Sequence, residues 1–345
     1  MKAAVFHDPL KMEVREDIVE PDLLPGEVLI EVKACGICGS DLHLYRTNAH
    51  RGSGVLRINE QGLEIPGHEY SGVILEIGEG VAGYQVGDRV VGVTGGGAFA
   101  ERVPVPANPY QLVHVPEGVS FEEAATTEPM ADALQMVRLA DIQPDENIVV
   151  FGVGIIGLGV IQALRALGKP ADKVVAIDVS APRLAMALDV GATDAINARE
   201  IPDVVAEVAK ICGTTPNIFG GPDAPRVDTV IDCAGYLKHM AGPPPLQSAL
   251  NMLKPRGGKI ICFGAYEGLV TLDLTYLIEK QVHIIGSLGY DASELAQGLE
   301  LMATGKVDRK KLITHHFPVD RIVEGFETQG AGAAIKVMIH PTSAA

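Results

Sequence analysis

Residues 148–157 read IVVFGVGIIG, an apolar run that passes directly into a G-x-G-x-x-G motif. The run has the composition of a buried strand, and residues 158–167 continue with apolar side chains at helical spacing. A second apolar segment, 173–177, ends in Asp178, about 20 residues after the motif. This order of strand, glycine turn, helix, strand and acid is typical of a dinucleotide-binding βαβ unit. It predicts a doubly wound parallel sheet in an α/β protein.

Each glycine of the motif has a separate physical role. Gly152 permits a tight turn, Gly154 lets the backbone approach a pyrophosphate, and Gly157 lets the helix pack on the strand. Ile155 and Ile156 lie where that helix begins, and a helix N-terminus attracts an anion. We therefore expect residues 152–157 to bind the cofactor phosphates.

Asp178 bears on the choice of cofactor, because a carboxylate accepts hydrogen bonds from ribose hydroxyls and repels a 2′-phosphate. This favours NAD over NADP. Arg183, which follows residues 180–182 (SAP), could reach a phosphate, but at a helix start it is as often solvated or in contact with adenine. We expect it to have a secondary role in cofactor binding.

Two segments nearer the N-terminus combine a thiol, an imidazole and a carboxylate. Residues 36–43 read GICGSDLH, and residues 67–69 read GHE. Taken singly, Cys38 is more often a buried core thiol and His68 an ordinary hydrogen-bonded histidine. The glycines indicate tight turns that carry both side chains to a common point, and zinc takes sulfur, nitrogen and carboxylate ligands. Together the segments predict a zinc site with one open position.

With these motifs in this order, the chain resembles the zinc-dependent medium-chain alcohol dehydrogenases, and more narrowly their sorbitol and threonine dehydrogenase branch. Further matches are the opening MKAA, VGDRV at 86–90, Glu128-Pro129 and GGKII at 257–261. The resemblance covers nearly the whole chain. It implies zinc ligands Cys38, His68 and Glu69, with Glu128 where other branches place a cysteine. Either carboxylate is expected to bind the metal directly or through water, and capping a following helix is the competing role for Glu128.

The resemblance also assigns three neighbours of these ligands. Asp41 is expected to accept the second ring N–H of the ligating histidine, which fixes its tautomer. Ser40 and His43 are expected to carry the proton of the alcohol to solvent through the cofactor ribose, while the nicotinamide takes the hydride. The expected reaction is a reversible, NAD-linked oxidation of a secondary alcohol, polyol or amino alcohol. A zinc-free quinone-type reductase and a non-catalytic nucleotide-binding relative are the alternatives.

Two domains are expected, since 345 residues exceed a single small core. Residues 1–143 are rich in strands, glycine and proline, and family likeness makes them a GroES-like, partly barrel-like β domain completed by 287–345. Residues 144–286 are expected to form the Rossmann NAD-binding domain. We expect six parallel strands near 148–151, 173–178, 195–196, 229–233, 259–263 and 283–286, and helices near 202–211, 246–253 and 275–280. In segment 287–345, which is expected to complete the first domain, we expect a helix at 292–304 and a strand at 334–339.

The five cysteines lie at positions 35, 38, 212, 233 and 262, and no four-cysteine lobe follows Gly92. We therefore expect one catalytic zinc per chain and no structural zinc. Cys35 and Cys38 form an isolated C-x-x-C, for which a redox disulfide is the competing interpretation. We expect Cys35 to pack at the end of strand 28–32 instead.

The net charge of −16 argues against binding to nucleic acid or to an anionic membrane. The sequence shows no signal peptide and no apolar run that would span a bilayer. A cytoplasmic enzyme with a small-molecule alcohol substrate is expected, and family likeness adds a homo-oligomer, either a dimer or a tetramer.

Three loop-like segments, 50–63, 213–226 and 241–246, are peculiar to this chain. The first contains His50, Arg51, Arg57 and Glu60. It is a candidate for substrate selection, although a solvated rim loop explains it equally well. The substrate itself and the physiological direction of the reaction are left open.

Overall fold

The computed structural model describes residues 1–49, 51, 56–169, 171–201, 203–216, 223–236, 240 and 242–342. The chain divides into two compact units, one made of Met1–Ala131 with Asp291–Ala345 and the other of Asp132–Tyr290. The first boundary falls inside helix α3 (Thr127–Ala140), at 131/132, where the sequence suggested 143/144. The second falls at 290/291, where the sequence suggested 286/287.

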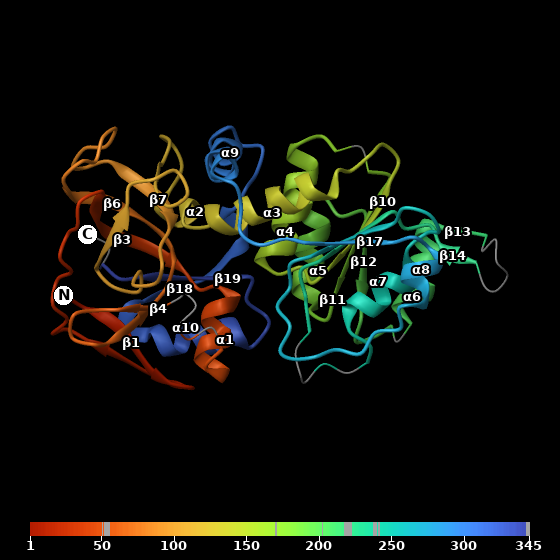
Figure 1. Ribbon diagram of the computed structural model, residues 1–345, viewed down its shortest axis with the longest axis horizontal. Coiled ribbons are helices and arrows are strands. Elements are labelled where there is room, and N and C mark those ends of the chain that lie inside the picture. Colours follow the sequence, from red (N-terminus) through yellow and green to blue (C-terminus); the bar gives the residue numbers. More distant parts are fainter. Residues whose placement is uncertain are drawn as a thin grey trace. The chain divides into compact units, whose positions relative to one another are not determined.

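A seven-stranded sheet forms the centre of the first unit, in the order β18-β19-β3-β6-β7-β9, with β8 paired to β3. Its strands are β3 (Glu27–Gly36), β6 (Glu69–Ile77), β7 (Arg89–Val93), β8 (Arg102–Pro106), β9 (Val113–His114), β18 (Ile313–Pro318) and β19 (Lys336–His340). The two C-terminal strands pair in parallel, and β19 runs antiparallel to β3. Chain ends that are remote in sequence therefore share one sheet (Figure 1).

A four-stranded sheet, β2-β1-β5-β4, belongs to the same unit. It is built from β1 (Ala3–Asp8), β2 (Lys11–Arg15), β4 (Leu56–Ile58) and β5 (Glu64–Pro66). The helical segments of the unit are α1 (Gly39–Thr47), α2 (Phe121–Ala124), the start of α3, α9 (Ala292–Ala303), η1 (Lys310–Leu312), η2 (Val319–Arg321) and α10 (Ile322–Gly330). Alternate side chains of β3, such as Val28 and Ile30, join Phe99 and Phe326 in the core.

The second unit contains a six-stranded sheet in the order β12-β11-β10-β15-β16-β17. Its strands are β10 (Asn147–Phe151), β11 (Lys173–Asp178), β12 (Asp194–Asn197), β15 (Thr229–Asp232), β16 (Lys259–Cys262) and β17 (His283–Gly286). Each strand is parallel to its neighbours. The predicted parallel sheet is confirmed, with its strands within a residue or two of the expected positions.

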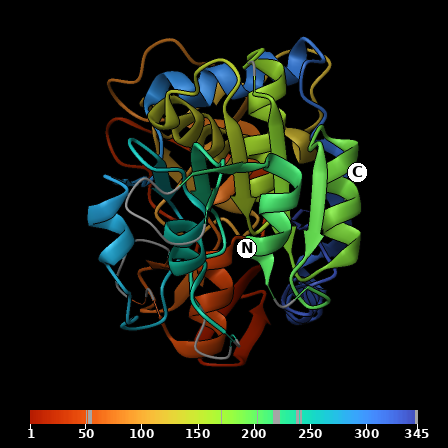
Figure 2. The same ribbon diagram turned by 90° about the vertical axis from the view of Figure 1, so that its right-hand side faces the viewer.

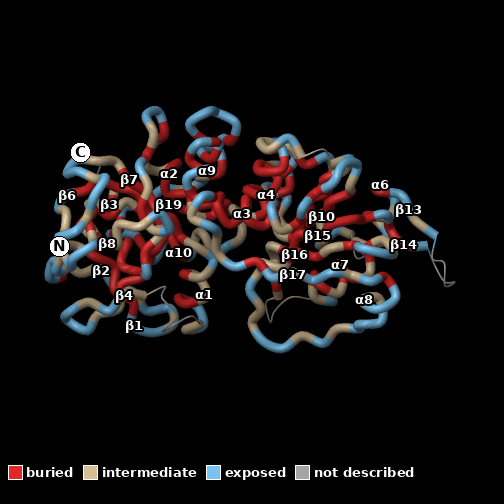
Figure 3. The backbone as a smooth tube through the Cα atoms, turned by 45° about the horizontal axis from the view of Figure 1, so that its top comes forward, coloured by how far each residue is buried: buried red, intermediate tan, exposed pale blue. Residues whose placement is uncertain are grey.

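Helices cover both faces of this sheet (Figure 2). They are α4 (Ile155–Ala166), α5 (Ala181–Asp189), α6 (Val204–Cys212), α7 (Pro245–Met252) and α8 (Thr275–Glu279). Val149 and Phe151 of β10 pack with Val208 of α6 and Leu250 of α7, so the alternate β10 side chains face the opposite layer. In both units the central strands are buried (Figure 3), and none of the described helices is both long and apolar enough to span a bilayer.

The three segments expected to be loops contain some regular structure. Segment 50–63 includes β4, and its residues 50 and 52–55 lie outside the described part of the chain. Segment 213–226 holds a two-stranded ladder, β13 (Thr214–Thr215) and β14 (Ala224–Pro225), on either side of undescribed residues 217–222. In segment 241–246, of which residue 241 is not described, proline opens α7 at its N-terminus. This agrees with the preference of proline for the first turn of a helix.

Candidate metal centre and nucleotide loop

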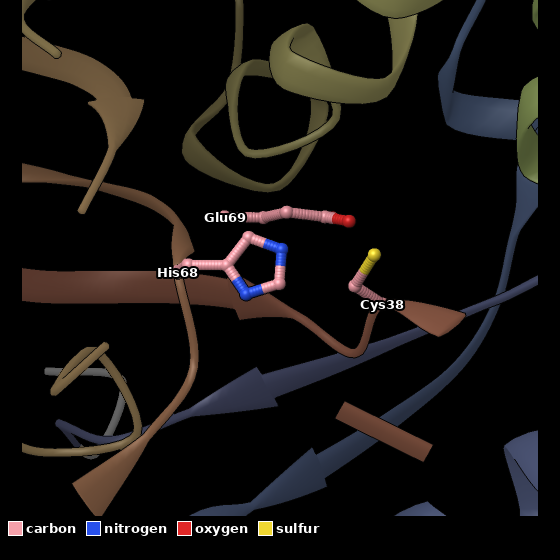
Figure 4. A group of neighbouring side chains, drawn as sticks. All are labelled: Cys38, His68 and Glu69. Atoms are coloured by element: carbon pink, nitrogen blue, oxygen red, sulfur yellow. The ribbon is translucent and has the colours of Figure 1, made fainter. Parts of the chain in front are cut away.

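Cys38, His68 and Glu69 meet at one end of the β3–β6 ladder. The antiparallel register pairs Gly36 with Glu69, so Cys38, which follows β3, and His68, which precedes β6, extend from the same end. One ligand atom from each of the three side chains lies within 4.8 Å of the other two (Figure 4). The structure thus brings together the three residues to which the sequence analysis assigned the zinc.

The surroundings of these side chains carry an excess of negative charge. Burial and the Glu69 carboxylate raise the pKa of Cys38. Burial by itself lowers the pKa of His68, but the Asp41 carboxylate and the Cys38 thiol outweigh it and raise that pKa well above its usual range. A divalent cation among these groups would neutralise the charge and ionise the thiol.

Asp41 connects Cys38 to His68. Its Oδ2 accepts a hydrogen bond from the backbone N–H of Cys38 at 3.0 Å, within a capping box that starts α1. Its Oδ1 lies 3.6 Å from His68 Nδ1, an ion-pair distance slightly beyond a hydrogen bond. The other ring nitrogen of His68 is directed toward Cys38 and Glu69 (Figure 4). Asp41 therefore lies where a carboxylate orients a metal-binding imidazole.

The donor set fits a zinc ion. Glu69 Oε1 is buried and has no hydrogen-bond partner among the described residues. Most buried polar atoms in folded proteins have such a partner. Sulfur, imidazole nitrogen and carboxylate oxygen are the ligand types that zinc prefers. The side chains of Cys38, His68 and Glu69 therefore fit a zinc ion.

Lys336 is a residue of this site that the sequence analysis missed. Its side chain comes from β19, is fully buried, contacts the Glu69 carboxylate and donates a hydrogen bond to Ile37 O at 3.0 Å. A Cβ atom at Gly36 would lie 2.4 Å from Glu69 Oε2 and 2.4 Å from Lys336 Cε, so only glycine leaves space for this ion pair. A lysine inside the apolar segment 334–339 (AIKVMI) was the available signal.

Glu128 lies in the first turn of α3 and is not among the three side chains whose ligand atoms gather within 4.8 Å. Its partly buried position and the Glu69 carboxylate nevertheless raise the pKa of Glu128 to about 7. Glu128 is therefore close enough to the cluster to interact electrostatically with Glu69, but its carboxylate is not one of the three grouped ligands. Ser40 and His43 are three residues apart in α1, a spacing that places side chains on the same helix face.

The glycine-rich loop has the conformation that its sequence requires. Gly152 follows β10 with φ +77°, and a Cβ atom there would lie 2.8 Å from the backbone nitrogen of Ala234. Asp178, at the end of β11, accepts hydrogen bonds from the N–H groups of Val153 at 2.8 Å and Ser180 at 2.9 Å. The loop and the acid thus meet at the carboxyl edge of the sheet, where ligands of such folds bind.

Arg183 lies beside this loop. Its Nη1 atom is 4.0 Å from the position that a Cβ atom would take at Gly154, the residue that precedes α4. Ile155, Ile156 and Gly157 form the first turn of that helix. The guanidinium is therefore close to the part of the loop assigned to the pyrophosphate.

All five cysteines carry free thiols. Cys35 is fully buried at the end of β3 and packs in the core of its unit. The packing role expected for Cys35 is confirmed, and the structure has no disulfide between Cys35 and Cys38.

Two family models match the chain: an alcohol dehydrogenase GroES-like domain over residues 24–117 and a zinc-binding dehydrogenase over residues 156–304. The chain is 34% identical to L-idonate 5-dehydrogenase of Vitis vinifera, over 93% of this chain and 89% of the relative. It is 32% identical to sorbitol dehydrogenase of Bacillus subtilis (strain 168), over 99% and 97%. The crystal structure of 2R,3R-butanediol dehydrogenase from Bacillus subtilis is similar with a TM-score of 0.80 and 29% identity, over 99% of both chains. The chain therefore belongs to the zinc-dependent medium-chain alcohol dehydrogenases, in their sorbitol dehydrogenase-like branch, and is an oxidoreductase that acts on CH–OH groups.

Proposed function

We propose that the protein uses NAD and one zinc ion per chain to oxidise a polyol reversibly to a ketone. Other secondary alcohols and amino alcohols are the wider substrate class. The convergence of the Cys38, His68 and Glu69 ligand atoms within 4.8 Å carries the proposal. The relatives named for idonate, sorbitol and 2,3-butanediol favour a substrate with adjacent hydroxyl groups.

The side chains around the metal would have different roles. Cys38, His68 and Glu69 would hold the ion, and Glu128 would approach it directly or through a water molecule. Asp41 would keep the His68 ring in the tautomer that presents a lone pair to the metal. When bound, zinc supplies the Lewis acidity that makes an alcohol hydroxyl acidic enough to lose its proton at neutral pH.

Ser40 and His43 would move that proton from the substrate hydroxyl to solvent. Their shared face on α1, directly after Cys38, supports this role. A hydroxyl can accept one proton while it donates another, and an imidazole exchanges protons readily near neutral pH. The path would deliver the hydroxyl proton to solvent, while the hydride from the adjacent carbon would reduce NAD⁺ to NADH.

Asp178 would select NAD. Its Oδ1 already accepts two backbone hydrogen bonds, from Val179 and Ser180. Its Oδ2 accepts one, from Val153, and keeps a second lone pair for a ribose hydroxyl. A 2′-phosphate would bring negative charge against this carboxylate. Gly152, Gly154, Ile155, Ile156 and Gly157 would receive the pyrophosphate, with Arg183 beside it.

A substrate screen tests the proposal. Purified zinc-loaded enzyme is mixed with NAD and a panel of polyols, amino alcohols and simple secondary alcohols, and NADH is followed by its absorbance. We expect turnover of at least one polyol and its loss after removal of zinc with a chelator. If the metal-free protein instead reduced quinones with a nicotinamide cofactor, the zinc-free reductase would be the correct function.

We also propose a cytoplasmic homo-oligomer, a dimer or a dimer of dimers. The edge strand β17 supports this, because it exposes Ile284 at 42% and is followed by Leu288 at 92%. Exposed apolar side chains at a sheet edge favour pairing with a second copy. Five free thiols are in keeping with a reducing compartment. Sedimentation equilibrium would show the mass of the oligomer, and Ile284→Lys should lower it.

A further inference from the structure

A second group of metal-ligating side chains lies in the first unit, away from Cys38. Glu122, His316 and His340 each offer one ligand atom, and these atoms lie within 4.8 Å of one another. Glu122 Oε1 is 2.8 Å from His316 Nδ1 and 2.9 Å from His340 Nε2. His340 is four residues beyond Lys336 in β19, or about 13 Å along the strand. Lys336 contacts Glu69 of the first cluster, so the two groups lie at different places along β19.

The sheet brings the two histidines together. Strands β18 and β19 are parallel, with His316 opposite Met338 and Pro318 opposite His340. Side chains two residues apart on a strand point to the same face, so His316 and His340 are diagonal neighbours. Their rings are 6.0 Å apart and nearly parallel, at 19°.

Helix α2 adds the carboxylate from a separate part of the chain. Glu122 is its second residue, and the start of the helix is fixed to β6 because Ser71 Oγ donates a hydrogen bond to Phe121 O at 2.5 Å. The backbone positions of the three ligands are thus set by the sheet and by an anchored helix. Their side chains are 27–48% exposed, so they retain freedom to adjust.

The hydrogen bonding of His340 prepares its ring for a metal. His340 Nδ1 is 3.1 Å from the backbone oxygen of Lys33. A carbonyl oxygen only accepts, so Nδ1 carries the hydrogen, and a neutral ring then has its lone pair on Nε2. That lone pair faces the Glu122 carboxylate, which is also an acceptor. Two acceptors 2.9 Å apart need a cation or a proton between them.

We propose that Glu122, His316 and His340 form a second binding site for a divalent transition metal such as Zn²⁺, separate from the catalytic zinc. Two imidazole nitrogens and one carboxylate oxygen suit this class of ion. The bond to Lys33 O is the outer contact that metal-binding histidines usually make. Ligand atoms around tetrahedral zinc are separated by about 3.3 Å, so the side chains need only a small outward shift.

The bound metal would fasten the C-terminal strands to the rest of the first unit. Glu122 belongs to the N-terminal segment, whereas His316 lies on the edge strand β18 and His340 on β19. Cross-links between segments remote in sequence stabilise a fold when only the native state forms them. This ion would be held less tightly than the catalytic one, because its ligands are more exposed and include no thiolate.

Titration with zinc tests the proposal. Tag-free enzyme is loaded at the catalytic site, freed of loosely held metal by gel filtration and titrated with ZnCl₂ by isothermal calorimetry. We expect one further binding event per chain, weakened at least about tenfold in each of Glu122→Gln, His316→Gln and His340→Gln. Anomalous scattering at the zinc edge should place the ion between the three side chains.

His315→Gln is the matched control. It removes the neighbouring histidine, whose Nδ1 lies 3.0 Å from Thr314 Oγ1 and which is not in the cluster. This variant should bind the second ion like the wild type, and alcohol turnover should be unchanged in all four variants. The proposed site would be overturned if the wild type showed no second zinc-binding event. It would also be overturned if His315→Gln weakened that binding as much as the ligand variants do.

The melting temperature tests the structural role. Added zinc should raise the Tm of wild type and His315→Gln by a few degrees and should leave His316→Gln and His340→Gln unshifted. Circular dichroism confirms that the variants are folded before the titration. A second ion that binds without raising the Tm would overturn the fastening role.

Discussion

The zinc-ligand cluster and the glycine-rich loop are assembled in opposite ways. The loop joins consecutive elements, β10 and α4, and its contact with Asp178 spans only 25 residues. The cluster takes Cys38 from the end of β3, His68 and Glu69 from the start of β6, and the supporting Lys336 from the last strand. The loop is therefore a local property of the chain, whereas the cluster depends on strand register across the whole first unit.

The two regions also differ in charge. At the loop, Asp178 is compensated by backbone N–H groups, which carry no net charge. In the cluster, ionisable side chains face one another with little solvent, and Lys336 is a fully buried cation beside Glu69. Removing one member of a buried charged group leaves its partner uncompensated. Substitutions should therefore affect stability strongly in the cluster and mainly cofactor affinity at the loop.

The largest effect is expected for Cys38→Ser and His68→Ala. Loss of a zinc ligand should reduce kcat on the order of 10³-fold or more, since Lewis-acid assistance contributes several kcal/mol. NADH affinity, measured by fluorescence titration, should change less than about twofold, because the glycine loop belongs to the other unit. Cys35→Ser is the control, since this buried thiol lies next to the cluster and should leave zinc content unchanged. A comparable loss of NADH affinity in both ligand variants would show that the zinc-ligand cluster and the glycine-rich loop do not act independently.

Lys336→Met should give the next largest effect, on stability. In the metal-free enzyme it leaves the Glu69 carboxylate buried without its cation, which costs about 3–5 kcal/mol. Urea unfolding measures this loss. Lys336→Arg, which keeps the charge, should lose less, and the double variant Lys336→Met with Glu69→Gln should recover most of the stability. If the double variant were no more stable than Lys336→Met, the ion pair would not be the cause.

Asp178→Ser should act on cofactor choice with a smaller effect. The loss of a hydrogen bond to a charged acceptor, about 1.5–3 kcal/mol, should lower kcat/KM for NAD about 10- to 150-fold. The same change should raise kcat/KM for NADP, because the repulsion of the 2′-phosphate is removed. Asp172→Ser, which removes an exposed carboxylate just before β11, should leave the preference as it is. An unchanged preference in Asp178→Ser would show that this residue does not contact the ribose.

The smallest effect is expected for cysteines of the second unit. Cys212→Ala and Cys262→Ala should cost about 1 kcal/mol or less in stability and leave kcat within about twofold. Zinc retained after gel filtration should stay at one ion per chain by elemental analysis, because these thiols pack beside the parallel sheet. A fall in zinc content in either variant would reveal a thiol-bound metal outside the first unit.

Several features were determined by the sequence itself. The order of strand, glycine turn, helix and acid is a local pattern, so residues 148–178 predicted the parallel sheet and the position of Asp178 correctly. The apolar segments gave the six strands to within a few residues, because buried parallel strands are short and continuously apolar. The GICGSDLH and GHE segments identified the three clustered ligands, since their residue types limit the chemistry.

Only the tertiary structure decided which remote side chains join those ligands. Register across β19, β3 and β6 brought Lys336 to Glu69 and required glycine at position 36, and no local pattern encodes such pairing. The same structure left Glu128 outside the closest ligand group, because it comes from α3 and not from the ladder. It also placed His316 beside His340 through parallel pairing of β18 and β19. Burial and long-range pairing, which depend on the whole fold, determine these contacts.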